Sequence, residues 1–131
     1  MSESAAATVR RLFELFGRDG LEPALELIDE DFVSVVPGSM SAEPDVYVGH
    51  DGARRYFAGF EGLMEQVRFE PLEIVEHGDV LIVSLRLSGR GAASGIEVEQ
   101  EAAVNVWVKD GKVTRMEPHP DMAEARQALD T

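Results

Sequence analysis

Apolar side chains in the first part of the chain recur at the spacing of amphipathic helices. Val9, Leu12, Phe13 and Phe16 fall at i, i+3, i+4 and i+7, so they share one side of a helix that ends near residues 17–20. A shorter helix follows, with Pro23 in its first turn, where a missing amide proton is tolerated. Its apolar side is predicted to consist of Ala24, Leu25, Leu27 and Ile28.

The third helix gives the longest amphipathic pattern, and short strands precede it. Residues 31–36 and 46–48 are predicted strands on either side of a loop that begins at Pro37-Gly38. The helix then keeps one apolar stripe for three turns, and the stripe consists of Ala53, Tyr56, Phe57, Phe60, Leu63 and Met64.

After Gln66 the period changes to the two-residue alternation of strands. A strand over 67–76 contains Pro71, which favours an edge position or a bulge. The next strand places Leu81, Val83, Leu85 and Leu87 on one face. Over residues 96–108 one face carries Val98, Gln100, Ala102, Val104, Val106 and Val108, and the other carries Glu97, Glu99, Glu101, Ala103, Asn105 and Trp107.

The end of the chain completes an α+β arrangement. Asp110-Gly111 is a hairpin signal before the last strand, and Asp121 is a suitable N-cap for a short C-terminal helix. Helices first and antiparallel strands afterwards predict one domain over residues 1–131, with helices packed on one face of a curved sheet. The glycine-rich "GRGAASG" lies between two strands, so it is predicted to be a bend, because a phosphate-binding loop requires a following helix.

Composition and charge exclude several classes of function. The chain has 131 residues, 25 acidic and 12 basic side chains, and a net charge of −13, which disfavours nucleic-acid and anionic-membrane partners. It contains no cysteine, and its three histidines are too far apart for a metal motif. No apolar run approaches the length of a membrane span and no leader pattern is evident, so a cytoplasmic protein without a cofactor is expected.

Four segments follow one another in an order that is specific for one fold, namely "LIDEDFVSVVPGS", "VYVGHDGARRYFAGF", "GRGAASGIEVEQEAAVNVWVKDGKVTR" and "PDMAEARQAL". Together they resemble the nuclear transport factor 2-like superfamily, in particular its SnoaL-like branch of polyketide cyclases and ketosteroid isomerase-related proteins. The resemblance implies a cone-shaped α+β barrel, in which three N-terminal helices cover a strongly curved, mostly antiparallel sheet and enclose an apolar cavity. It also implies a homodimer formed through the outer face of the sheet.

The catalytic residues of two activities of this superfamily are not matched. In the resemblance to epoxide hydrolases, Leu85, Leu87 and Pro118 stand where the catalytic charged residues are expected. Ketosteroid isomerases require a carboxylate base where this chain has residues 34–36, Ser-Val-Val, and a carboxylic acid near Ala102 or Ala103. Both activities are therefore disfavoured by the residues present.

Pocket residues are predicted where polar or aromatic side chains share the apolar rows. Gln100 is the polar member of its row and is expected either to bind a ligand oxygen or to meet water at the strand end. Tyr56 carries a hydroxyl on an apolar helix stripe and needs a partner. The predicted lining, for which plain core packing is the alternative, is Phe13, Phe16, Ser34, Tyr47, Tyr56, Phe60, Met64, Leu87, Gln100, Val104 and Met116.

One histidine is a candidate general acid or base. His119 follows the last strand, near the predicted mouth of the barrel, and histidine titrates near neutral pH. Strand alternation groups it with Arg115 and Glu117, opposite Met116, which favours an exposed, structural side chain instead. A loop carboxylate such as Asp45 is the alternative proton carrier.

A contact between protomers is predicted on the opposite sheet face. Ala103, Asn105 and Trp107 combine a large aromatic side chain with small and polar neighbours, as interfaces do, and Arg86 lies on the neighbouring strand. Two functions stay open. One is a hydrophobic small-molecule ligand converted by metal-independent acid–base chemistry, and the other is a dimeric binding module without catalysis.

Overall fold

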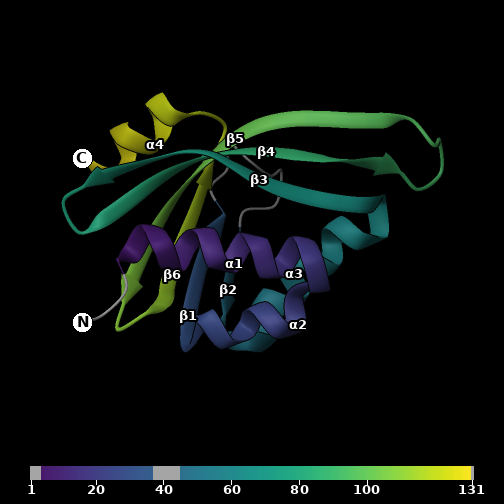
Figure 1. Ribbon diagram of the computed structural model, residues 1–131. Helices are drawn as coiled ribbons and strands as arrows, with labels where there is room; N and C mark the ends of the chain where they lie inside the picture. The colour runs from purple at the N-terminus through teal and green to yellow at the C-terminus, as the bar shows by residue number, and fades with distance from the viewer. Residues whose placement is uncertain (1–3, 37–44, 131) are drawn as a thin grey trace.

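The computed structural model describes residues 4–36 and 45–130, and it leaves out the side chains of residues 59–63 (Figure 1). Its elements are α1 Ala5–Asp19, α2 Leu21–Ala24, the 3₁₀ turn η1 Leu25–Leu27, β1 Ile28–Val36, β2 Asp45–Val48, α3 Gly49–Leu63, β3 Met64–His77, β4 Val80–Gly91, β5 Glu97–Lys109, β6 Lys112–His119 and α4 Met122–Leu129.

The strands of the described chain form one six-stranded sheet in the order β2-β1-β6-β5-β4-β3. Neighbouring strands are antiparallel except β1 and β6, which run parallel. The α+β fold with a mostly antiparallel sheet is thus confirmed. The sheet is curved but open, with β2 and β3 as its edges, so it forms a partial rather than a closed barrel.

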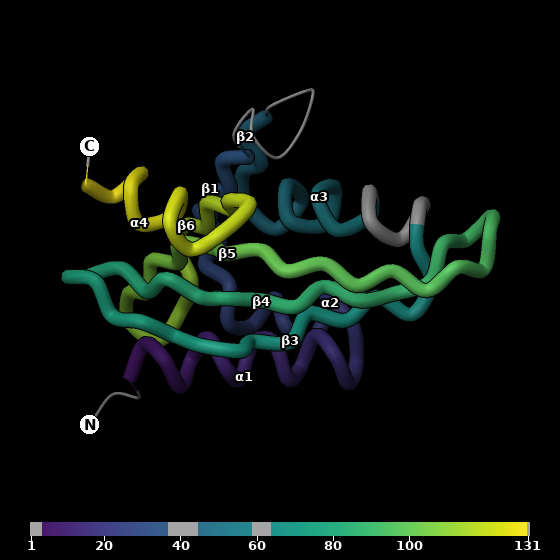
Figure 2. The backbone as a smooth tube through the Cα atoms, turned by 90° about the horizontal axis from the view of Figure 1, so that it is seen from above, coloured from purple at the N-terminus to yellow at the C-terminus, as the bar shows by residue number. Residues whose placement is uncertain are grey.

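The helices lie on both faces of the sheet. Figure 1 shows α1, α2 and α3 on one side and α4 on the other. Seen from above in Figure 2, α1 runs along β3, while α3 lies toward β1 and β2, in agreement with the contacts of these elements. We call the face covered by α1–α3 the inner face, and the face that carries α4 the outer face.

Helix α1 begins and ends where local side-chain chemistry predicts. Ser4 Oγ accepts a hydrogen bond from the Ala7 amide at 3.2 Å, which caps the first turn. At the other end Gly20 has φ +85° and donates its amide to the Phe16 carbonyl at 2.9 Å, a conformation that suits glycine. The apolar stripe between these ends faces the sheet, and Val9 and Leu12 are buried.

Two residues that the helical stripes include begin strands instead. Ile28 has φ −112° and ψ 127° and is the first residue of β1. Met64 is the first residue of β3. Both are apolar and inward-facing at a boundary, where helical and strand spacing cannot be distinguished by periodicity alone.

Helix α3 approaches β2 closely because its first turn contains glycine. A Cβ added to Gly52 would lie 2.8 Å from the Tyr47 carbonyl carbon, so a side chain there would push the helix and strand apart. His50 donates from Nε2 to the Ile28 carbonyl at 2.7 Å and fixes the start of α3 to the start of β1. His50 thus has a structural role at this junction.

The edge strand β3 is irregular at two places. Its register with β4 shifts between Glu65 and Arg68 and again between Pro71 and Glu73. Gln66 has φ +54° within the first irregularity, a conformation that residues other than glycine seldom adopt. Pro71 thus lies on an edge strand and beside a bulge, as the sequence predicts.

Both predicted connections between the long strands are tight turns. Asp110 and Gly111 join β5 to β6 with φ +53° and +76°, the left-handed pair of a type I′ hairpin. The "GRGAASG" segment closes the β4–β5 hairpin, where the Gly91 amide donates to the Ile96 carbonyl at 2.9 Å and the Gly95 amide to the Gly91 carbonyl at 2.9 Å. The prediction of a bend between strands is confirmed.

Each face of the sheet has its own apolar cluster. The larger one joins α1, η1 and α3 to the inner face and includes Val9, Leu12, Val83, Val106 and Val113. The smaller one consists of Ile82 and Ala103 on the outer face and Ala125 of α4, with Val75, Met122 and Leu129 packed against it. Because different helices cover the two clusters, the face on which a side chain lies determines which ligand site it can reach.

Candidate functional site

Aromatic rings gather between α1, α3 and the inner face of the sheet. Phe16 of α1 lies 5.0 Å from Phe57 of α3 and 5.2 Å from Phe69 of β3, measured between ring centroids, and Phe57 and Phe69 are 5.8 Å apart. These three rings are only half-buried, although they lie between two layers. We define the aromatic end of the inner layer as Phe16, Tyr47, Tyr56, Phe57 and Phe69.

Two tyrosines extend this group toward the β2 edge. The Tyr47 and Tyr56 rings meet edge to face at 5.2 Å, and Tyr56 is 5.4 Å from Phe57. Ser34 pairs in register with Tyr47, and it is 3% exposed. Its hydroxyl and those of the tyrosines introduce polar atoms into an otherwise apolar layer.

The Tyr56 hydroxyl is neutral at physiological pH. Burial, together with a smaller effect of the nearby Tyr47, raises the pKa of Tyr56 to about 12. A phenol with so high a pKa transfers its proton poorly at pH 7, but it remains a hydrogen-bond donor. Tyr56 is therefore suited to bind an oxygen atom rather than to supply a proton.

An arginine covers Tyr47, the tyrosine of the edge strand β2. The Arg55 guanidinium lies 4.4 Å from the centre of the Tyr47 ring, and its Nη1 is 3.1 Å from Asp45 Oδ2. Asp45, the predicted loop carboxylate, is the first residue of β2 and is held by this exposed ion pair. Asp45 is thus placed to orient Arg55 over the Tyr47 ring.

A cleft between α2 and α3 reaches the aromatic end. Its volume is about 340 Å³, and Phe57 lines it together with Leu21 and the aliphatic part of Arg54. Arg54 binds Glu22 of α2 at 2.9 Å and Asp51 at 2.8 Å, and its hydrogen bond lowers the pKa of Glu22. This ion-pair network joins α2 to α3 beside the cleft.

Several predicted pocket residues do come together on the inner face. Ser34 pairs with Tyr47 on one side and Met116 on the other, and Tyr56 packs against Tyr47. Phe16 completes the set at the α1 side. These five side chains belong to five different elements, from α1 to β6.

Among the other predicted lining residues, Leu87 lies beside Phe69 of the aromatic end, and the Phe13 ring lies 6.4 Å from the Phe69 ring between centroids. Phe13 and Val104 are 7% and 8% exposed and belong to the packed core. Leu87 pairs with Phe69 and Gln100, and Gln100 is exposed because it lies toward the β4–β5 hairpin tip. Met64 packs against Gly89 at the start of β3. The side chain of Phe60 is outside the described residues.

His119 lies on the outer face, away from the aromatic end. Its register partner is Ala103, and its Nε2 is 2.9 Å from Glu117 Oε1. The other carboxylate oxygen of Glu117, Oε2, lies 3.5 Å from Arg115 Nη2. The predicted grouping of these three residues is confirmed. The preference for an exposed His119 is wrong, because the side chain is only 7% exposed where α4 packs on this part of the sheet.

The four residues assigned to a contact between protomers separate into two pairs. Ala103 and Asn105 are fully buried, and Asn105 Nδ2 donates to the Ala125 carbonyl of α4 at 2.9 Å. This corrects their assignment, because α4 of the same chain occupies their surface. Trp107 stacks with Arg115 at 5.3 Å, and Arg86 forms ion pairs with Glu70, Glu99 and Glu101; both keep exposed surface.

The sequence analysis missed three members of the site. Phe57 was recognised on the helical stripe but not as lining, Phe69 lies beside a bulge that strand alternation does not register, and Arg55 lies off the stripe. One signal was available in the sequence. Aromatic residues occur both in the last turns of a predicted helix and on the edge strand that follows it.

No described set of three or more acidic or histidine side chains is arranged to hold a metal ion. Among the described residues, no helix is long and apolar enough to cross a membrane.

The family model of the SnoaL-like domain matches residues 9–116. This chain belongs to the SnoaL-like family. The match begins within α1 and ends within β6, and it includes every residue of the aromatic end. No curated protein matches the sequence.

Solved structures of similar fold cover the whole chain at low sequence identity. TerC, co-crystallised with polyporic acid, is 21% identical with a TM-score of 0.76, over 96% of this chain and 98% of TerC. IdmH, a candidate polyketide cyclase from Streptomyces antibioticus, is 19% identical with a TM-score of 0.75, over 98% and 100%. A candidate SnoaL-like polyketide cyclase from Jannaschia sp. CCS1 is 20% identical with a TM-score of 0.73, over 100% and 98%. At these identities the likeness establishes the fold.

Proposed function

We propose that this SnoaL-like protein binds a hydrophobic, oxygen-bearing small molecule at the aromatic end of the inner layer. The observation that carries the proposal is that five aromatic rings gather at one end of the inner layer and each keeps some exposed surface, whereas Val83, Val106 and Val113 at the other end have none. Flat apolar ligands stack on such rings. The relatives named as polyketide cyclases and the polyporic acid bound to TerC are consistent with an oxygenated ring system as ligand.

Tyr56 supplies the polar contact in this proposal. Its neutral phenol donates to a carbonyl or hydroxyl oxygen, and the edge-to-face contact with Tyr47 orients the ring. The cleft lined by Phe57 gives a route between α2 and α3.

The proposed role is binding rather than acid–base catalysis. On the inner face, the central side chains Val83, Leu85, Val106 and Met116 are apolar, and the polar Ser34 does not ionise. His119 lies on the other face, and Asp45 is paired with Arg55. A general base needs to lie within hydrogen-bond reach of the proton that it removes, and His119 does not meet that condition for a ligand at the aromatic end. The Asp45 carboxylate is already engaged by the Arg55 guanidinium.

A matched pair of ligands tests the proposal. 1-Tetralone and tetralin differ by one carbonyl oxygen, and both would be titrated into ¹⁵N-labelled protein while amide shifts are recorded. We expect shifts at Tyr56, Phe57 and Phe69. Tyr56→Phe should weaken 1-tetralone about fivefold, the value of one neutral hydrogen bond, and leave tetralin unchanged. Leu72→Ala, at an exposed apolar position of β3, is the control.

Two results would contradict the proposal. Shifts confined to the outer face would place the ligand elsewhere, and equal affinities of the Tyr56→Phe variant and the parent for 1-tetralone would remove the role of the hydroxyl. Exchange of the C2 protons of 1-tetralone in D₂O separates binding from catalysis, since we expect no acceleration over buffer.

A further inference from the structure

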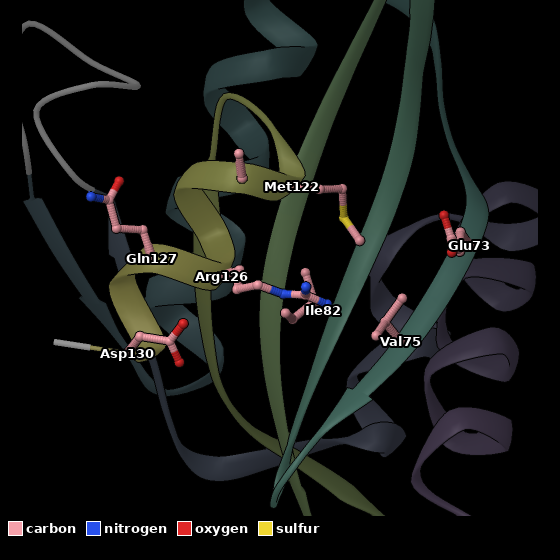
Figure 3. A pocket seen from close by; sticks show the side chains of 8 residues that line it. Glu73, Val75, Ile82, Met122, Arg126, Gln127 and Asp130 are labelled. Carbon is pink, nitrogen blue, oxygen red and sulfur yellow. The ribbon is translucent and has the colours of Figure 1, made fainter.

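A second cavity lies on the outer face, on the opposite side of the sheet from the aromatic end. It is a groove of about 710 Å³ between α4 and the strands β3 and β4. Figure 3 shows Met122 and Arg126 projecting from α4 on one side of this groove and Glu73 and Val75 on β3 forming the other. We call it the α4 groove.

The floor of the α4 groove is apolar. Val75, Ile82, Met122 and Ala123 line it, and Ile82 has no exposed surface. Val75 and Met122 pack against the small outer-face cluster. The apolar body of a ligand would cover the exposed surface of Val75, Met122 and Ala123 above the buried Ile82.

The groove is held open by the way α4 is attached. Asn105 Nδ2 donates to the Ala125 carbonyl at 2.9 Å and fixes the helix over β5. Asp130, just after the helix, lies 3.2 Å from His77 Nε2 at the end of β3. These two contacts determine the distance of α4 from β3. The groove is the space between α4 and β3.

One cation over this floor has no partner in the described chain. The Arg126 guanidinium forms no ion pair with a described residue, although acidic side chains outnumber basic ones by 25 to 12. Figure 3 shows it extended from α4 toward the strand that carries Ile82. Asp130, its neighbour on the rim, is already paired with His77. Glu73 stands on the opposite wall.

We propose that the α4 groove is a second binding site, for a small molecule with an apolar body and one carboxylate. Arg126 would receive the carboxylate, because a guanidinium presents two parallel donors that match its two oxygens. The body would lie along Val75, Met122 and Ala123. Glu73 repels a second negative charge on the ligand, so the site selects monoanions. The net charge of −13 is screened beyond about 8 Å at physiological salt, so the groups that line the groove set the local field, and among them Arg126 is the cation that attracts the carboxylate.

Naphthalene-2-carboxylate and naphthalene-2-carboxamide test this site. The two molecules share the apolar body and differ in charge. Titration into the ¹⁵N-labelled full chain is expected to shift the amides of Val75, Ile82, Met122 and Ala123, with the carboxylate bound more tightly. Arg126→Gln should weaken the carboxylate about tenfold, the value of a charge-assisted hydrogen bond, and change the carboxamide less than twofold.

Two further variants control for net charge and for repulsion. Arg11→Gln removes the same charge from an exposed position of α1, outside the groove, and should leave both affinities unchanged. Glu73→Gln removes the opposing carboxylate and should tighten the naphthalene-2-carboxylate about twofold. Circular dichroism of each variant establishes that the fold is retained.

The proposal fails if naphthalene-2-carboxylate shifts only inner-face amides, or if Arg126→Gln and Arg11→Gln weaken it equally. It also fails if sedimentation shows a dimer whose groove amides do not respond to either molecule, since a second copy then occupies the groove. These outcomes are independent of the aromatic end, because the responding amides lie on opposite faces of the sheet.

Discussion

The layer between the helices and the inner face is built differently at its two ends. At one end, Val9 and Leu12 of α1 meet Val83, Val106 and Val113, which are 0–4% exposed. At the other end, the same helix supplies Phe16, which meets Phe57 and Phe69 and stays half-buried. Branched aliphatic side chains interlock and exclude water, while rings meeting edge to face leave accessible ring surface. One layer thus combines a stable core with a surface suited to a ligand.

Truncation at the aliphatic end should have the largest effect. Leu12→Ala removes three carbons from a side chain that is 4% exposed, so we expect a loss of about 2–5 kcal/mol in the free energy of unfolding. Urea denaturation followed by circular dichroism measures the loss. Leu72→Ala, at a residue that is 40% exposed, should change the free energy by less than about 0.5 kcal/mol. Equal losses for the two variants would mean that the aliphatic end is not the closed core.

A methyl group at the aromatic end should act by pushing α3 from β2. Gly52→Ala places a Cβ 2.8 Å from the Tyr47 backbone, and we expect a loss of about 1–3 kcal/mol with changed near-ultraviolet circular dichroism of the tyrosines. Gly17→Ala is the matched control in α1, where an added Cβ meets nothing within 4 Å. That variant should be more stable than the parent by up to about 1 kcal/mol. Opposite signs for two glycine substitutions in helices would confirm the close approach, and a stabilised Gly52→Ala would refute it.

At high pH we expect the ionisation of Tyr56 at the aromatic end to lower the stability of the folded state. Because burial raises the pKa of Tyr56 to about 12, the folded chain keeps this phenol protonated between pH 10 and 12, while the unfolded chain loses the proton near pH 10. The folded state then binds more protons than the unfolded state, so stability falls with rising pH by at most about 1.4 kcal/mol per unit in this window.

The variant Tyr56→Phe lacks this dependence and serves as the comparison. Urea midpoints of parent and variant at pH 9.5 and 11.5 give the difference, since all other titrating groups are common to both proteins. A variant whose stability declines as steeply as that of the parent would show that Tyr56 ionises equally in both states.

Residue patterns predicted the fold better than they predicted the site. The spacing of Val9, Leu12, Phe13 and Phe16 and the alternation of Leu81, Val83 and Leu85 correctly assigned the side chains to faces, because burial on one face imposes a period. The turn at Asp110-Gly111 followed from local chemistry alone. These signals are carried by neighbours in sequence.

The location of the site depends on contacts between distant segments, which no local period records. Gln100 shares the row of Val104, yet it lies exposed toward the tip of the β4–β5 hairpin. Asn105 and His119 alternate outward, yet both are buried because α4 returns over the outer face. Coverage by a helix is a tertiary property, so strand alternation predicted the correct face for these side chains but could not predict the burial of Asn105 and His119 under α4. For Gln100 it left open both contact with a ligand and contact with water.

The two irregularities of β3 have a consequence for how the protein behaves at high concentration. An edge strand of fourteen residues offers unpaired amides and carbonyls to any other extended chain. In β3 the register breaks at Glu65/Arg68 and at Pro71/Glu73 interrupt that row, and Pro71 lacks an amide proton. An incoming strand therefore finds only short regular stretches, flanked by charged side chains. We infer that β3 is protected against amyloid-like strand addition by its own backbone, without a partner to cover it.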